Sequence, residues 1–250
     1  MYIVLERCSG IFTFCATKHE FLRRVDVDGL SNPTDIAACE LTSRLYIGDN
    51  PWYVKEPPAS ILRASADLTD VNHWLPRPPS DAFRLGTLSV TSARLLVMPV
   101  NIDQLLQFDA DGDELRRVPL PREAHHAVES PTGTFIVAHK NKEPKQQQVS
   151  EVNTEGQVLR LFCGSRLIPL SCPEHIAVDS QGNIFVADSG RILLLDAQLA
   201  LRRAIVDEHQ LNKKLPLRLC YIEQSGRLLV GFYDFHNRCS NFAVFDVLHQ

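Results

Sequence analysis

A short apolar segment that recurs along the whole chain constrains the fold more than any other feature of the sequence. Each copy spans three residues and ends in valine or isoleucine, and successive copies lie 40 to 50 residues apart. The six copies are YIV at 2–4, LYI at 45–47, LLV at 95–97, FIV at 135–137, IFV at 184–186 and LLV at 228–230. This regular spacing indicates an internal repeat that runs through all 250 residues.

Each copy belongs to a larger repeated pattern. Another apolar segment and a polar turn precede it, as in HIAVDSQGN before Ile184, and two further strands around a charged turn follow it. Apolar residues alternate with a period of two, and turn glycines such as Gly182 suit tight hairpins. Four short antiparallel strands per unit are typical of one β-propeller blade, which covers its faces only by stacking on neighbouring blades.

The repeat therefore predicts an all-β fold, a six-bladed β-propeller of four-stranded blades that forms a single domain over residues 1–250. The predicted blades span residues 1–30, 31–78, 79–121, 122–165, 166–208 and 209–250. In this alignment the chain opens at the second strand of the first blade and ends near the third strand of the sixth. Two strands of a complete ring thus have no counterpart in the repeat.

Residues 171–198, SCPEHIAVDSQGNIFVADSGRILLLDAQ, resemble the NHL repeat. The matching residues are Pro173, Ile176, Ala177, Val178, Asp179, Gly182, Asn183, Ile184, Val186, Ala187, Asp188, Arg191 and Ile192. A weaker match over 32–50 involves Pro33, Ile36, Ala37, Tyr46, Ile47, Gly48 and Asp49. The resemblance implies NHL-like blades and three kinds of function: the protein- or RNA-binding platforms of tripartite-motif proteins, secreted zinc-dependent lyases, and more distant calcium-dependent lactonases.

Composition narrows the classes of partner. The formal net charge of −4 argues against a general nucleic-acid binder, so DNA is not expected as a partner. No apolar run approaches the ~18 residues that span a bilayer, so no membrane contact is expected. The seven cysteines are odd in number and lack a C-x-x-C pair, which predicts reduced, mostly core-filling thiols and a cytoplasmic location.

Histidines supply the weak candidates for a metal site. Alignment of the inner strands on Val178 places His125 and His175 at equivalent positions, and the other residues at this position are Asp35, Thr87 and Leu219. His139 follows a second strand and is the nearest further nitrogen ligand for zinc. Because Thr87 and Leu219 share the position, we interpret these histidines as lining a polar channel mouth. The sequence thus predicts no catalytic residue, no metal and no cofactor.

Two aspartates, Asp49 and Asp188, follow second strands at matching points of the repeat. Aspartates at such points commonly bond backbone amides and shape a turn, so we expect a structural role for both.

A local basic patch supports an alternative function in single-stranded RNA binding, for which basic side chains among aromatic platforms are needed. Its candidate residues are Arg122, His126, Lys140, Lys142, Lys145 and Arg166. Acidic residues are about as numerous on the same predicted face, which favours a solvated loop.

Aromatic residues in long loops favour a protein partner, because such side chains anchor interfaces. The candidates are Trp52, Tyr53, Tyr233, Phe235 and His236, while Trp74 is expected to pack between blades. The sequence therefore predicts a non-enzymatic, NHL-like scaffold for protein interaction. RNA binding is the first alternative, and a metal-dependent lyase or lactonase-like enzyme is the second.

Overall fold

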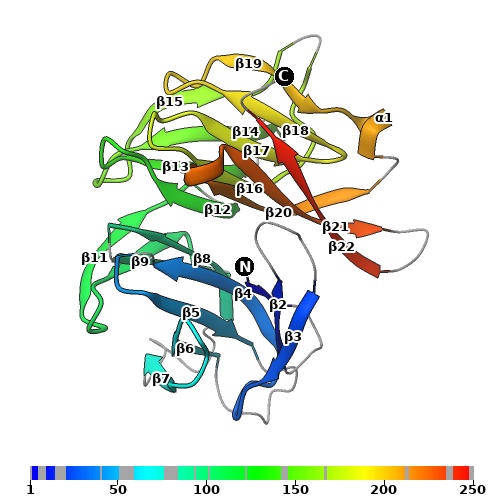
Figure 1. The fold of residues 1–250 in the computed structure, drawn as a ribbon. Helices are drawn as coiled ribbons and strands as arrows, with labels where there is room; N and C mark the ends of the chain where they lie inside the picture. Colours follow the sequence, from blue (N-terminus) through cyan, green and yellow to red (C-terminus); the bar gives the residue numbers. More distant parts are fainter. Residues whose placement is uncertain are drawn as a thin grey trace. The chain divides into compact units, whose positions relative to one another are not determined.

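Antiparallel sheets make up nearly all the regular structure of this chain in the computed structural model (Figure 1). The structure describes residues 2–4, 10–14, 21–39, 41–50, 59–75, 84–92, 94–100, 102–121, 123–141, 146–165, 168–211, 214–234 and 239–247. These residues form twenty-two strands in six sheets, together with one short α-helix and one 3-10 turn. We number the sheets 1 to 6 in chain order.

The chain divides into two compact units, Met1–Arg117 and Val118–Gln250, and the first contains sheets 1 to 3. Sheet 1 consists of β1 (Tyr2–Val4), β2 (Gly10–Phe14) and β3 (Phe21–Asp26). Sheet 2 consists of β4 (Pro33–Cys39), β5 (Arg44–Asp49), β6 (Ser60–Ser65) and β7 (Val71–Leu75). Sheet 3 consists of β8 (Arg84–Thr91), β9 (Arg94–Val100), β10 (Gln104–Phe108) and β11 (Glu114–Pro119), whose end lies beyond the unit boundary.

The second unit contains sheets 4 to 6. Sheet 4 consists of β12 (Ala124–Glu129), β13 (Phe135–Asn141), β14 (Gln146–Val152) and β15 (Val158–Phe162). Sheet 5 consists of β16 (Pro173–Val178), β17 (Ile184–Asp188), β18 (Arg191–Leu195) and β19 (Leu201–Val206), and α1 (Glu208–Leu211) follows it. Sheet 6 consists of β20 (Leu215–Ile222), the 3-10 turn Glu223–Ser225, β21 (Arg227–Asp234) and β22 (Cys239–Asp246).

The strand order confirms the predicted four-stranded repeat and corrects the predicted number of blades. Four sheets have four strands each, whereas sheets 1 and 6 have three strands each among the described residues. The twenty-two described strands suffice for five four-stranded blades at most, so the prediction of a six-bladed propeller is wrong and the structure supports five blades.

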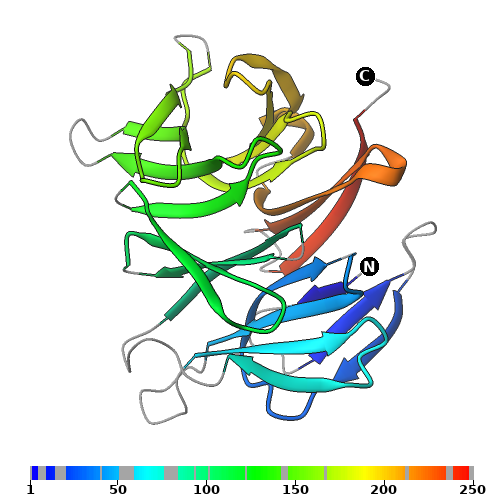
Figure 2. The same ribbon diagram turned by 90° about the vertical axis from the view of Figure 1, so that its left-hand side faces the viewer.

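Hydrophobic contact between consecutive sheets forms the core of each unit, as expected for sheets that cannot cover both faces alone. Four clusters of buried residues each join two neighbouring sheets. In each cluster, buried residues of one sheet are grouped with buried residues of the next sheet. Examples are Ile11 with Ile47, Tyr46 with Leu88, Ile136 with Ile176, and Phe185 with Leu219. In the second unit the first strands β12, β16 and β20 of successive sheets lie next to one another (Figures 1 and 2).

Outer-strand side chains also tie each sheet to the next within a unit. Three arginines in the last strands of sheets 1, 4 and 5 each lie beside a bulge, and each donates to a backbone carbonyl outside the strands of the following sheet. They are Arg23, Arg160 and Arg203. The acceptors are Asp67 O at 3.2 Å, Ala197 O at 3.0 Å and Val247 O at 3.0 Å, respectively.

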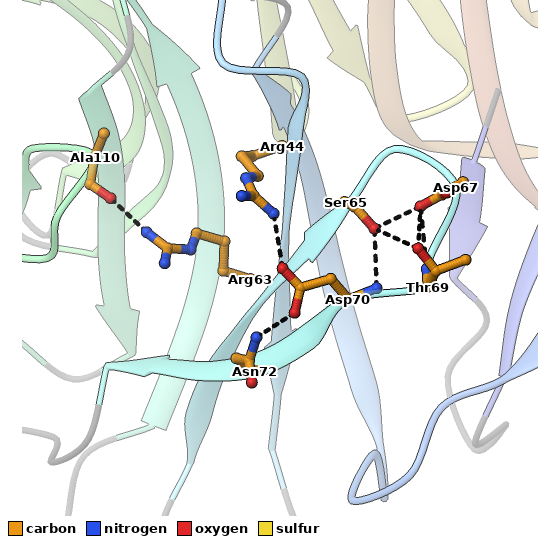
Figure 3. A network of polar contacts seen from close by, with 8 residues as sticks. All are labelled: Arg44, Arg63, Ser65, Asp67, Thr69, Asp70, Asn72 and Ala110. Carbon is orange, nitrogen blue, oxygen red and sulfur yellow. Dashed lines mark hydrogen bonds and ion pairs between the residues drawn. The ribbon is translucent and has the colours of Figure 1, made fainter.

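Between sheets 2 and 3 a different pair makes this connection. Arg63 Nη1 donates to Ala110 O at 2.9 Å (Figure 3). Trp74 Nε1 donates to the same carbonyl at 3.1 Å. Trp74 is only 6% exposed and packs edge-on against Tyr46 and Phe108. The prediction that Trp74 packs between sheets is therefore confirmed.

The turn that receives Arg23 is itself held by an aspartate (Figure 3). The Asp67 carboxylate accepts hydrogen bonds from Ser65 Oγ at 2.6 Å and Thr69 Oγ1 at 2.8 Å. These two bonds, with a third from the Thr69 backbone, lower the pKa of Asp67 to about 2. The turn thus keeps its shape well below neutral pH.

Candidate functional site

A β-bulge recurs at the same place in the first strand of sheets 2 to 6, and it decides which residues are equivalent. Each bulge inserts one unpaired residue near the start of the strand. The residues directly after the bulge are Asp35, Thr87, His126, His175 and Arg218. The prediction that placed His125 and Leu219 at this position is wrong by one residue in each strand. The strand register aligns Glu129 and Tyr221 with Val178, which an alignment of apolar letters does not show.

Three of these post-bulge side chains form what we call inter-sheet latches, in which each accepts a backbone N–H from the first strand of the next sheet. Leu88 N donates to Asp35 Oδ2 at 2.8 Å. Ile176 N donates to His126 Nδ1 at 3.1 Å, and Leu219 N donates to His175 Nδ1 at 3.3 Å. A carboxylate and two imidazoles therefore do the same structural task at equivalent positions.

The two histidine latches are buried and stacked on each other. His126 is 1% exposed and His175 is 7% exposed, and their ring centroids lie 3.7 Å apart with an interplanar angle of 20°. Because a backbone N–H donates to each Nδ1, that nitrogen carries no proton and each ring is neutral. Burial, the neighbouring His126 and the charge of Arg218 together hold the pKa of His175 well below its ordinary value of 6.5.

These contacts remove two residues from the predicted sites. His126 was predicted to contact RNA, but its side chain lies inside the protein and holds sheet 5. His175 was a weak metal candidate, but its Nδ1 already accepts the Leu219 amide.

The carboxylates of Asp49 and Asp188 confirm the expectation that they bond backbone amides. Asp49 accepts the amides of Ser31 and Asn32, and Asp188 accepts those of Ser171 and Cys172 at 2.9 Å and 2.7 Å. The amides lie in the segment before the first strand of the same sheet, not in the following turn.

Sheet 4 departs from this arrangement, because His139 occupies the position of these aspartates in the strand register. Its Nε2 lies 2.7 Å from Ser150 Oγ, while its Nδ1 and His125 Nε2 are buried with no hydrogen-bond partner among the described residues. Burial and the nearby His125 lower the pKa of His139 to about 4. His139 is thus a neutral side chain at physiological pH.

The start of β16 adds a thiol and a carboxylate. Cys172 Sγ donates to Glu174 Oε1 at 2.8 Å. Burial raises the pKa of Cys172 to about 12, with smaller contributions from Glu174 and Asp188, and Lys140 acts in the opposite direction. At neutral pH this thiol is protonated and is not a nucleophile.

The arrangement therefore favours structural over catalytic chemistry for these groups. Ser150 is 0% exposed and His139 is 4% exposed, so a substrate cannot reach their hydrogen-bonded pair. Within the described part of the chain, no group of three or more His, Cys, Asp or Glu side chains has metal-binding geometry.

The predicted binding residues fall mostly outside the described residues. Tyr233 lies half-buried in β21, and Lys140 lies half-buried in β13, where its backbone N–H donates to Glu123 O at 3.2 Å. The remaining candidates outside the described residues are Trp52, Tyr53, Phe235, His236, Arg122, Lys142, Lys145 and Arg166.

Sequence reasoning missed an exposed apolar strand. β15 lies at one edge of sheet 4, and its side chains Val158, Leu159 and Leu161 are 51%, 51% and 49% exposed. The signal was the run VLRLF itself, in which strict alternation of apolar and polar residues fails.

Two further expectations concern thiols and membranes. The cysteines that the structure describes, Cys39, Cys163, Cys172 and Cys220, are all free thiols, but only Cys39 is buried. The expectation that the thiols mostly fill the core therefore holds for Cys39 and is wrong for the other three described cysteines. No helix in the described ranges is long and apolar enough to cross a membrane.

Several solved structures resemble this chain in fold, although their sequence identity to it is low. A luciferin-regenerating enzyme matches with a TM-score of 0.69 and 12% identity, over 99% of this chain and 87% of that chain. A chain of a nidogen–laminin complex matches with a TM-score of 0.65 and 14% identity, over 97% and 92%. The chain has a β-propeller fold.

Function does not follow from these likenesses. A third propeller, a gluconolactonase from Xanthomonas campestris, matches with a TM-score of 0.63 and 14% identity, over 88% of this chain and 75% of that chain. The three neighbours thus include two enzymes and a component of a protein complex, and identity this low supports the fold alone. No family model and no curated protein matches this propeller.

Proposed function

We propose that this propeller is a non-enzymatic, NHL-like scaffold for protein interaction, and that β15 is one of its binding edges. The exposed apolar strand carries the proposal. Val158, Leu159 and Leu161 each expose about half of their surface, so this strand has three exposed apolar side chains within four residues.

The position of β15 suits an extended partner segment. An edge strand presents backbone donors and acceptors that can pair with an added strand, while alternate side chains give specificity. Arg160 is engaged within the protein, by Glu151 Oε2 at 3.1 Å and by Ala197 O at 3.0 Å. Its charge is thus partly neutralised, and the edge lacks the free lysine or proline that commonly prevents strand pairing.

The internal use of the polar residues also supports a scaffold. His126, His175, Asp49 and Asp188 all hold backbone amides, and the Cys172 thiol is protonated at neutral pH. These polar side chains are therefore engaged in holding the fold. The proposal includes a second contact surface for the partner, made of the residues that the sequence predicts for protein binding. These residues are Trp52, Tyr53, Tyr233, Phe235 and His236.

The test places a photo-crosslinking amino acid at position 159 of the full chain and, as a matched control, at position 115. Leu115 is also an outer-strand leucine and is 48% exposed, but it lies between Glu114 and Arg116. We expect discrete protein adducts in cells from position 159 and few from position 115. We also expect Leu161→Lys to remove the adducts and Leu115→Lys to leave them unchanged.

Equal adduct patterns from positions 159 and 115 would contradict the β15 edge. A separate assay with single-stranded RNA tests the first alternative, because binding that weakens steeply with salt would favour the basic patch over a protein partner.

A further inference from the structure

The stacked pair His126 and His175 forms two latches in series along the second unit. His126 in β12 holds Ile176 in β16, and His175, the residue before Ile176, holds Leu219 in β20. The rings are in contact, with centroids 3.7 Å apart. The three first strands of sheets 4, 5 and 6 are therefore linked through two adjacent imidazoles.

Each latch requires a neutral ring. A neutral imidazole has one acceptor nitrogen, whereas an imidazolium has two donors and no acceptor. A proton added at Nδ1 would therefore break the hydrogen bond from Ile176 or from Leu219. Two charged rings at the observed separation would also repel each other in a buried setting, where charges are poorly screened.

The net effect of the surroundings disfavours a positive charge on His175, although a hydrogen bond with the Ile176 backbone acts in the opposite direction. The ionisable groups that act on His175 are His126 from β12 and the guanidinium of Arg218 from β20, and both disfavour the charged ring. Ionisable residues on the adjoining strands are engaged elsewhere. His139 bonds Ser150, Glu151 pairs with Arg160, and Asp188 pairs with Arg191 at 2.7 Å.

The first unit contains an equivalent latch without a histidine, which serves as a comparison. In sheet 2 the same latch is made by Asp35, whose carboxylate accepts the Leu88 amide. A carboxyl group keeps an acceptor oxygen in either protonation state, whereas a solvent-exposed histidine with a pKa near 6.5 takes up a proton at pH 5 to 6 and loses its acceptor.

We propose that the His126–His175 pair is an acid-sensitive switch that loosens the contacts among sheets 4, 5 and 6 when the pH falls below about 6.5. Opening exposes the rings, and the opened state takes up protons that the closed state excludes. Opening thus becomes about tenfold more frequent at pH 5.5 for each histidine that is exposed, and about a hundredfold for both. The Asp35 latch does not respond in this range.

Amide hydrogen exchange of the full chain tests the switch at pH 7.5 and pH 5.5, with rates corrected for the intrinsic effect of pH. We expect the protection of the Ile176 and Leu219 amides to fall by about tenfold or more, while that of Leu88 changes by less than about threefold. Unchanged protection of Ile176 and Leu219 in this range would overturn the proposal.

Variants assign the effect to individual rings. Asn keeps an oxygen acceptor of the length that Asp35 uses but does not titrate, so His126→Asn should lower the pH dependence at Ile176 by about tenfold. His175→Asn should do the same at Leu219. His139→Gln is the matched control, because this buried histidine of the same unit does not latch two sheets, and it should leave both responses intact.

A second measurement covers the possibility that an Asn variant does not fold. In the wild-type protein, the amide NMR signals of Ile176 and Leu219 should shift together between pH 7 and pH 5, and the Leu88 signal should not. Persistence of the full pH response in the folded His126→Asn and His175→Asn variants would contradict the assignment to these rings.

Discussion

Gly48 of β5 lies directly against the side chain of Leu85 of β8, so sheets 2 and 3 meet closely at a residue without a side chain. A Cβ at position 48 would overlap Leu85 Cδ2 and would come within 3.5 Å of Leu88 Cδ1. Leu85 is 2% exposed and has little room to move. We expect Gly48→Ala to lower the free energy of unfolding by about 1–3 kcal/mol, measured by urea denaturation.

A matched position provides the control for this prediction. Gly231 pairs with Arg218 as Gly48 pairs with Asp35, but its added Cβ would meet Arg218 Cβ at an ordinary 3.5 Å. Gly231→Ala should therefore cost less than Gly48→Ala. Addition of Leu85→Ala should recover part of the loss at Gly48→Ala, and strictly additive effects would contradict a clash between the two residues.

Trp74 contributes packing more than hydrogen bonding to the contact between sheets 2 and 3. Its ring contacts Tyr46 and Phe108, while its Nε1 shares the Ala110 carbonyl with Arg63. Trp74→Phe should therefore cost about 1 kcal/mol, and Trp74→Ala should cost about 3–5 kcal/mol. Denaturation monitored by circular dichroism measures both, and equal losses would contradict the dominance of packing.

Asp188 should be the most sensitive carboxylate of the second unit. It is 0% exposed, accepts the amides of Ser171 and Cys172, and pairs with Arg191 at 2.7 Å. Asp188→Ala removes the acceptor of both amides and the carboxylate that pairs with Arg191, which keeps its hydrogen bond to Pro169 O. It should lower the free energy of unfolding by about 3–5 kcal/mol. Asp188→Asn keeps an oxygen acceptor and should cost about 1–2 kcal/mol less than Asp188→Ala, measured by the same urea titration.

The repeat in the sequence predicted the architecture well because strand pairing within a sheet depends on local patterns. The alternating segments around Val97 and Val186 read as strands, and both are central strands of four-stranded sheets. The number of complete blades was not predicted correctly. Completion depends on strands at the two ends of the chain, and sheets 1 and 6 each have three among the described residues.

The candidate site was predicted less well because its chemistry depends on the exact strand register. The register places His126, not His125, at the position equivalent to His175, and a shift of one residue moves a side chain to the opposite face of a strand. Apolar periodicity carries no signal for that shift. The sequence likewise could not show that Ile176 and Leu219 donate to these rings, since each latch joins residues at least 44 positions apart.

His139 should make the protein less stable in acid. Its pKa in the folded state, about 4, lies below the ordinary value of 6.5, so the folded state favours the neutral ring. The associated stability is present above pH 6.5 and is lost as the pH falls toward 4, because the unfolded chain takes up the proton first. We expect a loss of about 2 kcal/mol over this range, after allowance for solvent screening.

The variant His139→Gln isolates this contribution. Gln does not titrate but keeps a polar group near Ser150, so the variant should lose less stability than the wild type between pH 6.5 and pH 4. The histidines His126 and His175 remain in both proteins and cancel in the comparison. Parallel stability curves for the two proteins would contradict the role of His139.

Cys172 should be nearly inert to alkylation although it is only half-buried. Its pKa of about 12 leaves very little thiolate at pH 8, and the thiolate is the reactive form. Iodoacetamide labelling followed by mass spectrometry should modify the exposed Cys220 at least about a hundredfold faster than Cys172. Glu174→Gln removes the carboxylate that accepts the Cys172 thiol and should accelerate labelling of Cys172 by about tenfold. The Cys220 rate is the internal control and should not change, because a parallel increase at both cysteines would indicate general unfolding instead of a lower pKa at Cys172.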